Sequence, residues 1–295
     1  MCDLRLDFER FTTNGPSLTT EANGGLCQDM LTVTTVSKTQ KCAQIHTVYH
    51  VFENLFRIPV KSFQNFVEKI QDNTVRKMAN FSDNTSMYFV VFLVYLDIGR
   101  GSSDTANLAF TFSGTFSRYF DIKVTQIPCD VNYDPPNGCL QYHTGIDGRF
   151  ETFNFDGGQH LRNQNYRVCV RQEEGYCCIV WMQCANDAFR LNSATSGDFD
   201  KAQIGSNCSE DYIEIEASSQ SGGGNIQDRY CGGQLNGVPE STVDAKIKDC
   251  TPPFEVSVVT DATDDTIDSG ANANTGVCLE YTQEPCGSGF VGPAP

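Results

Sequence analysis

Residues 208–216 read CSEDYIEIE, and residues 229–233 read RYCGG. Each stretch carries one cysteine, and residues 212–215 form a short run of strand-favouring side chains. The polar, glycine-rich run SSQSGGGN at residues 218–225 separates the two stretches and is typical of a loop. A short strand followed by a polar turn predicts antiparallel β-structure in this part of the chain.

The same pattern of short strands between polar loops extends in both directions. In residues 4–11, Leu4, Leu6 and Phe8 alternate with charged residues, which predicts a half-buried strand. Further strands are predicted at residues 30–34, 106–112, 120–127, 150–155, 166–171, 178–182, 212–215, 254–259 and 277–282. Many short strands joined by turns rich in Gly, Ser, Asn and Asp predict an all-β protein, either a sandwich or a barrel.

Composition excludes several classes of protein. The chain has 295 residues, of which 39% are hydrophobic and 20% charged. This suffices for packed cores in about two domains. The formal net charge of −16 does not fit a nucleic-acid-binding protein, which needs a cationic surface. The apolar run MYFVVFLVYL at residues 87–96 is too short to span a bilayer and predicts a buried strand.

Fourteen cysteines indicate an oxidising compartment. Zinc sites need cysteine pairs at short spacings such as CxxC, and the sequence contains none of them. Disulfide bonds are therefore the favoured explanation, and we expect a secreted, extracellular protein. The chain starts MCDLRLDF, which lacks the pattern of a signal peptide, so we expect that the natural N-terminus is missing from this sequence.

Residues 36–95 differ from their surroundings. They contain seven basic and four acidic residues, so this block has a charge of +3 in a strongly acidic chain. Phe63, Phe66, Val67 and Ile70 have the spacing of one helical face. The block is therefore either a genuine helical insertion or a stretch foreign to the fold.

We favour a retained intron or a wrongly predicted exon for this block. Its first residues, Val36 and Ser37, can be encoded by the donor-like hexamer GTAAGT, and its final run FVVFLVY has pyrimidine-rich codons. This hypothesis would deprive Cys27 of its natural partner and leave it unpaired or joined to Cys42.

The second half of the chain resembles a CUB domain of the kind found in arthropod secreted proteins. Five motifs occur in the family's order between Cys129 and Cys286. They are CLQYHTGIDGRFETFNF (139–155), HLRNQNYRVCVRQEEGYC (160–177), CSEDYIEIE (208–216), RYCGG (229–233), and the closing pair FEVSVVTD (254–261) and GVCLEYTQEPC (276–286). The resemblance implies an antiparallel β-sandwich of jelly-roll type.

The first part resembles a second, incomplete copy. CDLRLDFERFTTNGP and CQDMLTVT are similar to the middle strands of the family, and residues 96–129 to its last strands. The opening strands ahead of Cys2 are missing, and so is the Ile-Cys-Gly turn that should follow MLTVT. We therefore expect a partial domain at residues 1–128, interrupted at about 36–95, a CUB domain at 129–286 and a flexible tail at 287–295.

The resemblance also implies a function. CUB domains are non-catalytic extracellular modules that bind proteins or glycans, so we expect a recognition module that uses loops at an end of the sandwich. One alternative is an ancillary region of a modular extracellular protease. Another is a carbohydrate-binding, lectin-like domain. We expect no nucleic-acid partner and no membrane span.

The family pattern implies two disulfide bonds, Cys139–Cys169 and Cys208–Cys231. Seven cysteines remain in this half when Cys129 is counted, so one of them must be free or bonded elsewhere. We expect Cys177 or Cys178 to be this residue, because adjacent cysteines rarely have the geometry to form useful bridges.

Calcium is the cofactor that the resemblance raises. Many CUB domains hold Ca²⁺ with a Glu on an earlier strand and two Asp residues, and Asp211 and Asp261 match the two Asp positions. Residues 188–193 (AFRLNS) carry Arg190 where the Glu would be expected. We therefore predict weak calcium binding or none, and no other cofactor.

The remaining candidates are modest. Asn80, Asn84 and Asn207 lie in N-glycosylation sequons. The histidines are His46, His50, His143 and His160, and HTVYH lacks the Glu of a zinc-protease motif. No GxSxG or GDSGG motif is present, so we predict no enzymatic activity. Trp181, the single tryptophan, is predicted to belong to the core.

Overall fold

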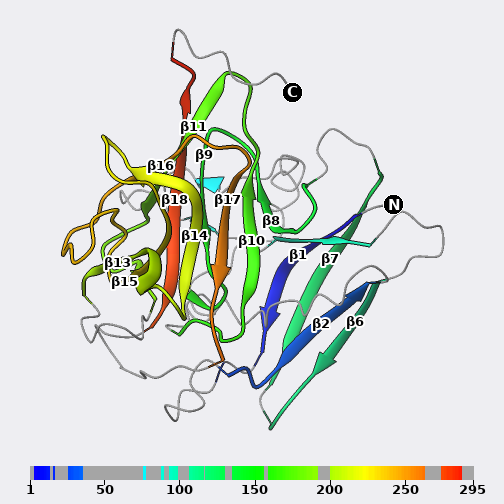
Figure 1. Cartoon of the computed structure of the whole chain (residues 1–295). Coiled ribbons are helices and arrows are strands. Elements are labelled where there is room, and N and C mark those ends of the chain that lie inside the picture. The colour runs from blue at the N-terminus through cyan, green and yellow to red at the C-terminus, as the bar shows by residue number, and fades with distance from the viewer. Residues whose placement is uncertain are drawn as a thin grey trace, which may run out of the picture.

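The computed structural model is an all-β structure (Figure 1). It describes residues 3–13, 16, 26–35, 76–77, 88–89, 93–98, 106–115, 117–129, 135–155, 159–191, 200–262 and 274–287. The one helical element that lies wholly within these ranges is the short 3₁₀ helix η3 (Gly205–Asn207). No helix in the described part of the chain is long and apolar enough to cross a membrane. The all-β prediction is confirmed.

The second half forms one curled sheet of eleven strands. Its strands are β8 (Cys139–His143), β9 (Asp147–Glu151), β10 (Asn165–Val170), β11 (Tyr176–Gln183), β12 (Phe189–Arg190), β13 (Ala202–Ile204), β14 (Tyr212–Gln220), β15 (Gln227–Gly232), β16 (Ile247–Asp249), β17 (Phe254–Val259) and β18 (Gly276–Pro285). The order β8-β10-β17-β14 makes one layer, and β9, β18, β11 and β16 make the other. The predicted jelly-roll sandwich is confirmed.

Strand β14 joins the two layers. Tyr212 to Glu214 pair with β17, whereas Ser219 and Gln220 pair with β16 in the other layer. Between these segments Ala217 has a φ of 51°, which bends the strand. A strand that changes layers at such a bend closes the corner of a sandwich.

The core lies between the layers. On β17, Phe254, Val256 and Val258 alternate with half-buried residues, as expected for a strand with one face on the core. Trp181 is fully buried, and its ring lies edge-on to those of Phe150 and Tyr281. The structure therefore gives Trp181 the core role that the sequence predicted.

The first half contains shorter sheets. Its strands are β1 (Asp3–Thr12), β2 (Met30–Thr35), β3 (Arg76–Lys77), β4 (Tyr88–Phe89), β5 (Leu93–Asp97), β6 (Ala106–Thr111) and β7 (Tyr119–Ile127). Strand β1 lies between β5 and β7, and β2 pairs with β6. Leu4, Leu6 and Phe8 are buried, as their alternation predicted.

The last residues of the 36–95 block form part of strand β5. Strand β5 begins at Leu93, and Val94 and Leu96 are fully buried against β1, so the end of the 36–95 block belongs to the fold. The predicted strand at 87–96 is instead the separate strands β4 and β5. The expected helix around Phe63 to Ile70 lies outside the described residues.

The two halves are in contact (Figure 1). Tyr95 of β5 meets Tyr142 of β8 edge-to-face, with 6.0 Å between ring centroids. Ile127 at the end of β7 and the bonded pair Cys139 and Cys169 complete this buried cluster. This packing places the first half beside β8.

Five disulfide bonds cross-link the second half. Two are the pairs that the family pattern implies, Cys139–Cys169 and Cys208–Cys231. The other three are Cys177–Cys286, Cys178–Cys250 and Cys184–Cys278. Cys129 is also disulfide-bonded, and Cys27 is a free thiol.

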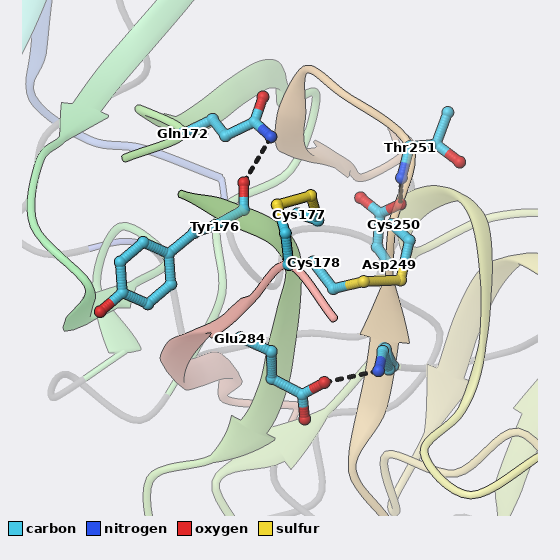
Figure 2. The surroundings of a disulfide bond; sticks show 10 residues. Gln172, Tyr176, Cys177, Cys178, Asp249, Cys250, Thr251 and Glu284 are labelled. Carbon is cyan, nitrogen blue, oxygen red and sulfur yellow. Dashed lines mark hydrogen bonds and ion pairs between the residues drawn. A yellow bond between two sulfur atoms is a disulfide. The ribbon is translucent and has the colours of Figure 1, made fainter. Parts of the chain in front are cut away.

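The expectation for Cys177 and Cys178 was wrong, because both residues are bonded (Figure 2). Strand β11 has β18 on one side and β16 on the other, so adjacent cysteines can bond to different neighbouring strands. Cys177 lies at a register shift in the pairing of β11 with β18. Cys178 comes just before Ile179, which pairs with Asp249 of β16, so Cys178 is next to Cys250. The vicinal pair therefore links β11 to both neighbours.

Asp249 provides a pH test of this region. Its side chain accepts a hydrogen bond from the Thr251 amide (Figure 2), and burial raises its pKa to about 6 from the ordinary 3.8. Because the folded protein holds the Asp249 proton more tightly than the unfolded chain does, this proton stabilises the fold fully below pH 3.8. That stabilisation is lost as the pH rises through about 6. We expect Asp249→Asn to exceed wild type in stability by about 2–3 kcal/mol at pH 7, and by little at pH 3.5. Urea unfolding at pH 3.5 and at pH 7 measures the stability difference between Asp249→Asn and wild type. The same difference at both pH values would contradict the prediction.

Candidate recognition site at the loops of the sandwich

Asp211 organises one end of the second sandwich. It immediately precedes β14 and is almost fully buried. One carboxylate oxygen accepts a hydrogen bond of 3.0 Å from the backbone amide of Asp261, which follows β17. The other lies 3.2 Å from Nε2 of His160, whose side chain is also buried. Asp211 thus links the loops that precede β10 and follow β17.

Backbone hydrogen bonds fix the same loops. The Asn163 amide donates to the Asp261 carbonyl at 2.7 Å, and the Thr260 amide donates to the Gln164 carbonyl at 2.9 Å. The His160 amide donates to the carbonyl of Asn274, just before β18. Backbone hydrogen bonds therefore hold two connections together at this end, the one between β9 and β10 and the one between β17 and β18.

A second set of loops presents apolar side chains to solvent. Ile226 in the β14–β15 connection is 70% exposed, and Val238 and Val243 in the β15–β16 connection are 52% and 65% exposed. The two connections adjoin, because the Ser221 amide donates to the Lys246 carbonyl at 2.7 Å. We call residues 221–226 and 233–246 the loop surface. Figure 1 shows both connections on the side of the second half away from β7.

Buried polar contacts hold the longer of these loops. Asn236 is 4% exposed, and its amide nitrogen donates to the Ser241 hydroxyl and the Val243 carbonyl. The Glu240 amide donates to the Ala202 carbonyl on β13. The loop therefore presents Val238 and Val243 from an ordered backbone, which lowers the entropic cost of binding a partner.

Residues 136–284 match the family model of the animal CUB domain. That stretch is just over half of the chain. The chain belongs to the animal CUB domain family. CUB domains typically serve as extracellular protein-interaction modules, and the five disulfides fit an extracellular setting.

Solved structures give two comparisons. The CUB1-EGF-CUB2 domain of human MASP-1/3 is 14% identical in sequence. The match covers 96% of this chain and 89% of the MASP-1/3 chain, with a TM-score of 0.29. The CUB1-EGF-CUB2 domains of rat MASP-1 are 15% identical in sequence. The match covers 95% of this chain and 87% of the rat chain, also with a TM-score of 0.29. Comparison with curated proteins gave no match.

The residues of this CUB domain do not fit the family's calcium site. Arg190 occupies the strand where the Glu was expected, and it pairs with Asp187 at 2.7 Å and Asp200 at 3.3 Å. One carboxylate oxygen of Asp211 accepts a hydrogen bond from the Asp261 amide, and the other lies 3.2 Å from Nε2 of His160. No group of three metal-ligating side chains occurs within the described ranges. A cation at Asp211 would have to displace these contacts.

We therefore expect calcium to bind weakly or not at all to the second half. Isothermal titration calorimetry at millimolar Ca²⁺ should give no saturable heat, and thermal unfolding should be the same in Ca²⁺ and in EGTA. Heat that saturates at micromolar Ca²⁺ and disappears in Asp211→Ala would contradict this prediction.

Of the glycosylation candidates, only Asn207 lies among the described residues. It is exposed on η3, beside the bonded Cys208, and its Nδ2 donates to Gln203 Oε1 at 3.2 Å. Its modification stays a prediction. Asn80 and Asn84 lie outside the described residues, as do His46 and His50.

The sequence did not predict the loop surface. Ile226, Val238 and Val243 are scattered apolar residues in polar loops, and such residues can be either buried anchors or exposed contacts. Only their exposed fractions distinguish these two roles.

Proposed function

We propose that the protein is a secreted extracellular recognition module that binds protein ligands through the loop surface. What supports this is the exposure of Ile226, Val238 and Val243 on two adjoining loops that are held by buried hydrogen bonds. Ordered loops that carry exposed apolar side chains suit protein interfaces, whose centres are apolar. The acidic charge of −16 favours a basic rim on the partner.

We further propose that the chain has two units. Residues 129–286 would be the complete CUB domain and residues 1–128 a partial copy interrupted at about 36–95. The tail expected at 287–295 lies, apart from Gly287, outside the described residues. Strand β1 pairs antiparallel with β7 in the first half, as β11 pairs with β18 in the second half, and this repeated arrangement supports the division.

An array of recombinant extracellular domains, probed with the multimerised full chain, tests the function. We expect at least one protein ligand whose binding is lost in Val238→Asp and Val243→Asp. The matched control, Ala262→Asp, adds the same charge at an exposed position beside Asp261 and should bind normally. Equal loss in all three variants would contradict recognition through the loop surface.

The same three variants on a glycan array test the lectin alternative. We expect no glycan signal. Binding to a glycan that survives both valine substitutions would replace the proposed function by carbohydrate recognition.

We propose that the chain has no chemistry of its own. His143 has a buried Nε2, and burial lowers its pKa to about 4, while His160 lies against Asp211. Neither imidazole is placed to act as a base on a substrate. Panels of peptidase and glycosidase substrates should show no turnover. Turnover abolished by one serine or carboxylate substitution would contradict the proposal.

A further inference from the structure

The Cys178–Cys250 bond is the most exposed of the five disulfide bonds whose two cysteines the structure describes. Cys250 is exposed and Cys178 is half-buried (Figure 2). Each of the other four bonds has at least one buried cysteine, and these are Cys139, Cys169, Cys177, Cys208, Cys231 and Cys278. Disulfide exchange begins with the attack of a thiolate on a sulfur atom, so exposed bonds are the labile ones.

Cys250 begins the turn between β16 and β17. Residues 250–253, which make up this turn, are all exposed. The residue before it, Asp249, is buried and accepts a hydrogen bond from the Thr251 amide (Figure 2). A soluble thiol can therefore approach Cys250 from the turn while β16 stays paired.

The bond fastens β16, which is only three residues long. Residues 247–249 pair with β11, and Ser219 and Gln220 at the end of β14 pair with the same strand. A side-chain ion pair joins Lys248 to Glu284 of β18. Because so short a strand makes few backbone hydrogen bonds, its opening needs little free energy once the covalent link is broken.

Asp249 destabilises this strand at neutral pH. Burial raises the pKa of its carboxyl to about 6, so at pH 7 a buried side chain carries a negative charge in the folded protein. This charge favours release of β16 into water. The bond from the next residue, Cys250, to Cys178 holds β16 on β11 against that tendency.

Strand β16 also anchors both parts of the loop surface. Residues 233–246 lead directly into β16, and residues 221–226 follow directly after β14. The Ser221 amide donates to the Lys246 carbonyl, and the Ala245 amide donates to the Leu235 carbonyl, each at 2.7 Å. Loss of β16 from β11 would therefore loosen the base of both loops.

We propose that the Cys178–Cys250 bond is a site of thiol–disulfide exchange that controls the order of the loop surface. The reactant is a small thiol of the glutathione class in its thiolate form. The thiolate attacks Sγ of Cys250 and forms a mixed disulfide there. The bond between the two cysteines breaks, and its electron pair leaves with Sγ of Cys178, which takes a proton from water. The reverse attack by the Cys178 thiolate restores the bond and releases the thiol.

The neighbouring Cys177–Cys286 bond is not suited to this role. Cys177 is buried, and Cys286 follows β18. Strand β18 pairs with β11 along most of its length and with β9 on its other side, so it stays in place without the bond. Removal of this bond is therefore a matched control on the adjacent residue of β11.

The exchange is tested on the purified full chain. Free thiols are first blocked with N-ethylmaleimide, and the protein is then incubated with reduced glutathione in native buffer at pH 7.5. Released thiols are trapped with iodoacetamide, and cleavage at acidic residues such as Glu255 separates Cys250 from Cys286 for mass spectrometry. We expect glutathione or label on Cys250 at least about tenfold faster than on Cys286 or any other bonded cysteine of the second half. Earlier reaction at another bond, or reaction of all bonds together, would overturn the proposal.

Hydrogen exchange tests the effect on the loops. In the glutathione-treated protein and in Cys178→Ser/Cys250→Ser, amides of residues 221–226 and 233–249 should exchange at least about tenfold faster than in the untreated wild type. Cys177→Ser/Cys286→Ser should keep the wild-type rates there. Equal rates in the two double variants, or faster exchange spread evenly over the second half, would contradict control through β16. The treated wild type gives this result even if a variant fails to fold.

Only the consequence for ligand binding rests on the proposed function. Neither measurement uses a ligand, so the exchange site can fail while the loop surface still binds its partner. The array of extracellular domains can likewise give no ligand while the exchange at Cys250 is observed. If a ligand is found, glutathione treatment should weaken its binding about tenfold or more, because the loops lose their ordered backbone. Unchanged binding by protein that carries glutathione on Cys250 would overturn the control of the loop surface.

Discussion

Replacing Cys231 by serine is expected to destabilise the second half by about 3–4 kcal/mol and to abolish secretion. Cys208 and Cys231 are both fully buried, and their bond closes a loop of 23 residues. That loss is a large share of the about 5–15 kcal/mol that keeps a domain folded. Denaturant unfolding of refolded protein gives the free-energy change, and the yield in culture medium gives the secretion.

Cys27→Ser is the matched control for this experiment. Cys27 is the free thiol among the described residues, so removal of its sulfur breaks no bridge and should cost less than about 1 kcal/mol. If Cys231→Ser were secreted with the same yield as Cys27→Ser, the Cys208–Cys231 bond would not be needed for a stable fold, which would contradict the prediction.

Replacing Asp211 by alanine is expected to destabilise the protein by about 3–5 kcal/mol. The substitution removes the carboxylate that faces the buried His160 side chain and accepts a partly buried hydrogen bond from the Asp261 amide. Asp211→Asn keeps an oxygen that can accept the Asp261 amide, so it should lose less stability than alanine. Urea unfolding with a common m-value separates the two variants.

Equal losses for Asp211→Ala and Asp211→Asn would show that the hydrogen bond to Asp261 contributes little and that the charge opposite His160 dominates. A loss below about 1 kcal/mol for alanine would contradict the central place given to Asp211 at this end of the sandwich.

Alternation along the chain predicted the strands that have one face on the core. Strand β17 matches its predicted range, and β1 and β7 extend theirs by one residue at one end or both. Strands β13, β15 and β16 escaped prediction, because two of them are three residues long and β15 begins with the polar run Gln227 to Arg229. Such strands form by pairing with neighbours rather than by their own propensity.

The site was less predictable than the fold. Asp211 and Asp261 were identified as a pair, and the structure brings them together, but through a backbone amide rather than a shared cation. The role of His160 was missed, because it lies 51 residues before Asp211 in the chain. The bonding of Cys177 and Cys178 was missed for a similar reason, since spacing along the chain does not reveal that β11 has a partner on each side.

Non-reducing peptide mapping of the secreted protein tests the disulfide framework of the CUB sandwich. We expect peptides that join Cys139 to Cys169, Cys177 to Cys286, Cys178 to Cys250, Cys184 to Cys278 and Cys208 to Cys231. Because Cys177 and Cys178 are adjacent, the map needs cleavage or fragmentation between them to assign their partners. Cys208 joined to any residue other than Cys231 would contradict the CUB sandwich from which the loop surface is presented.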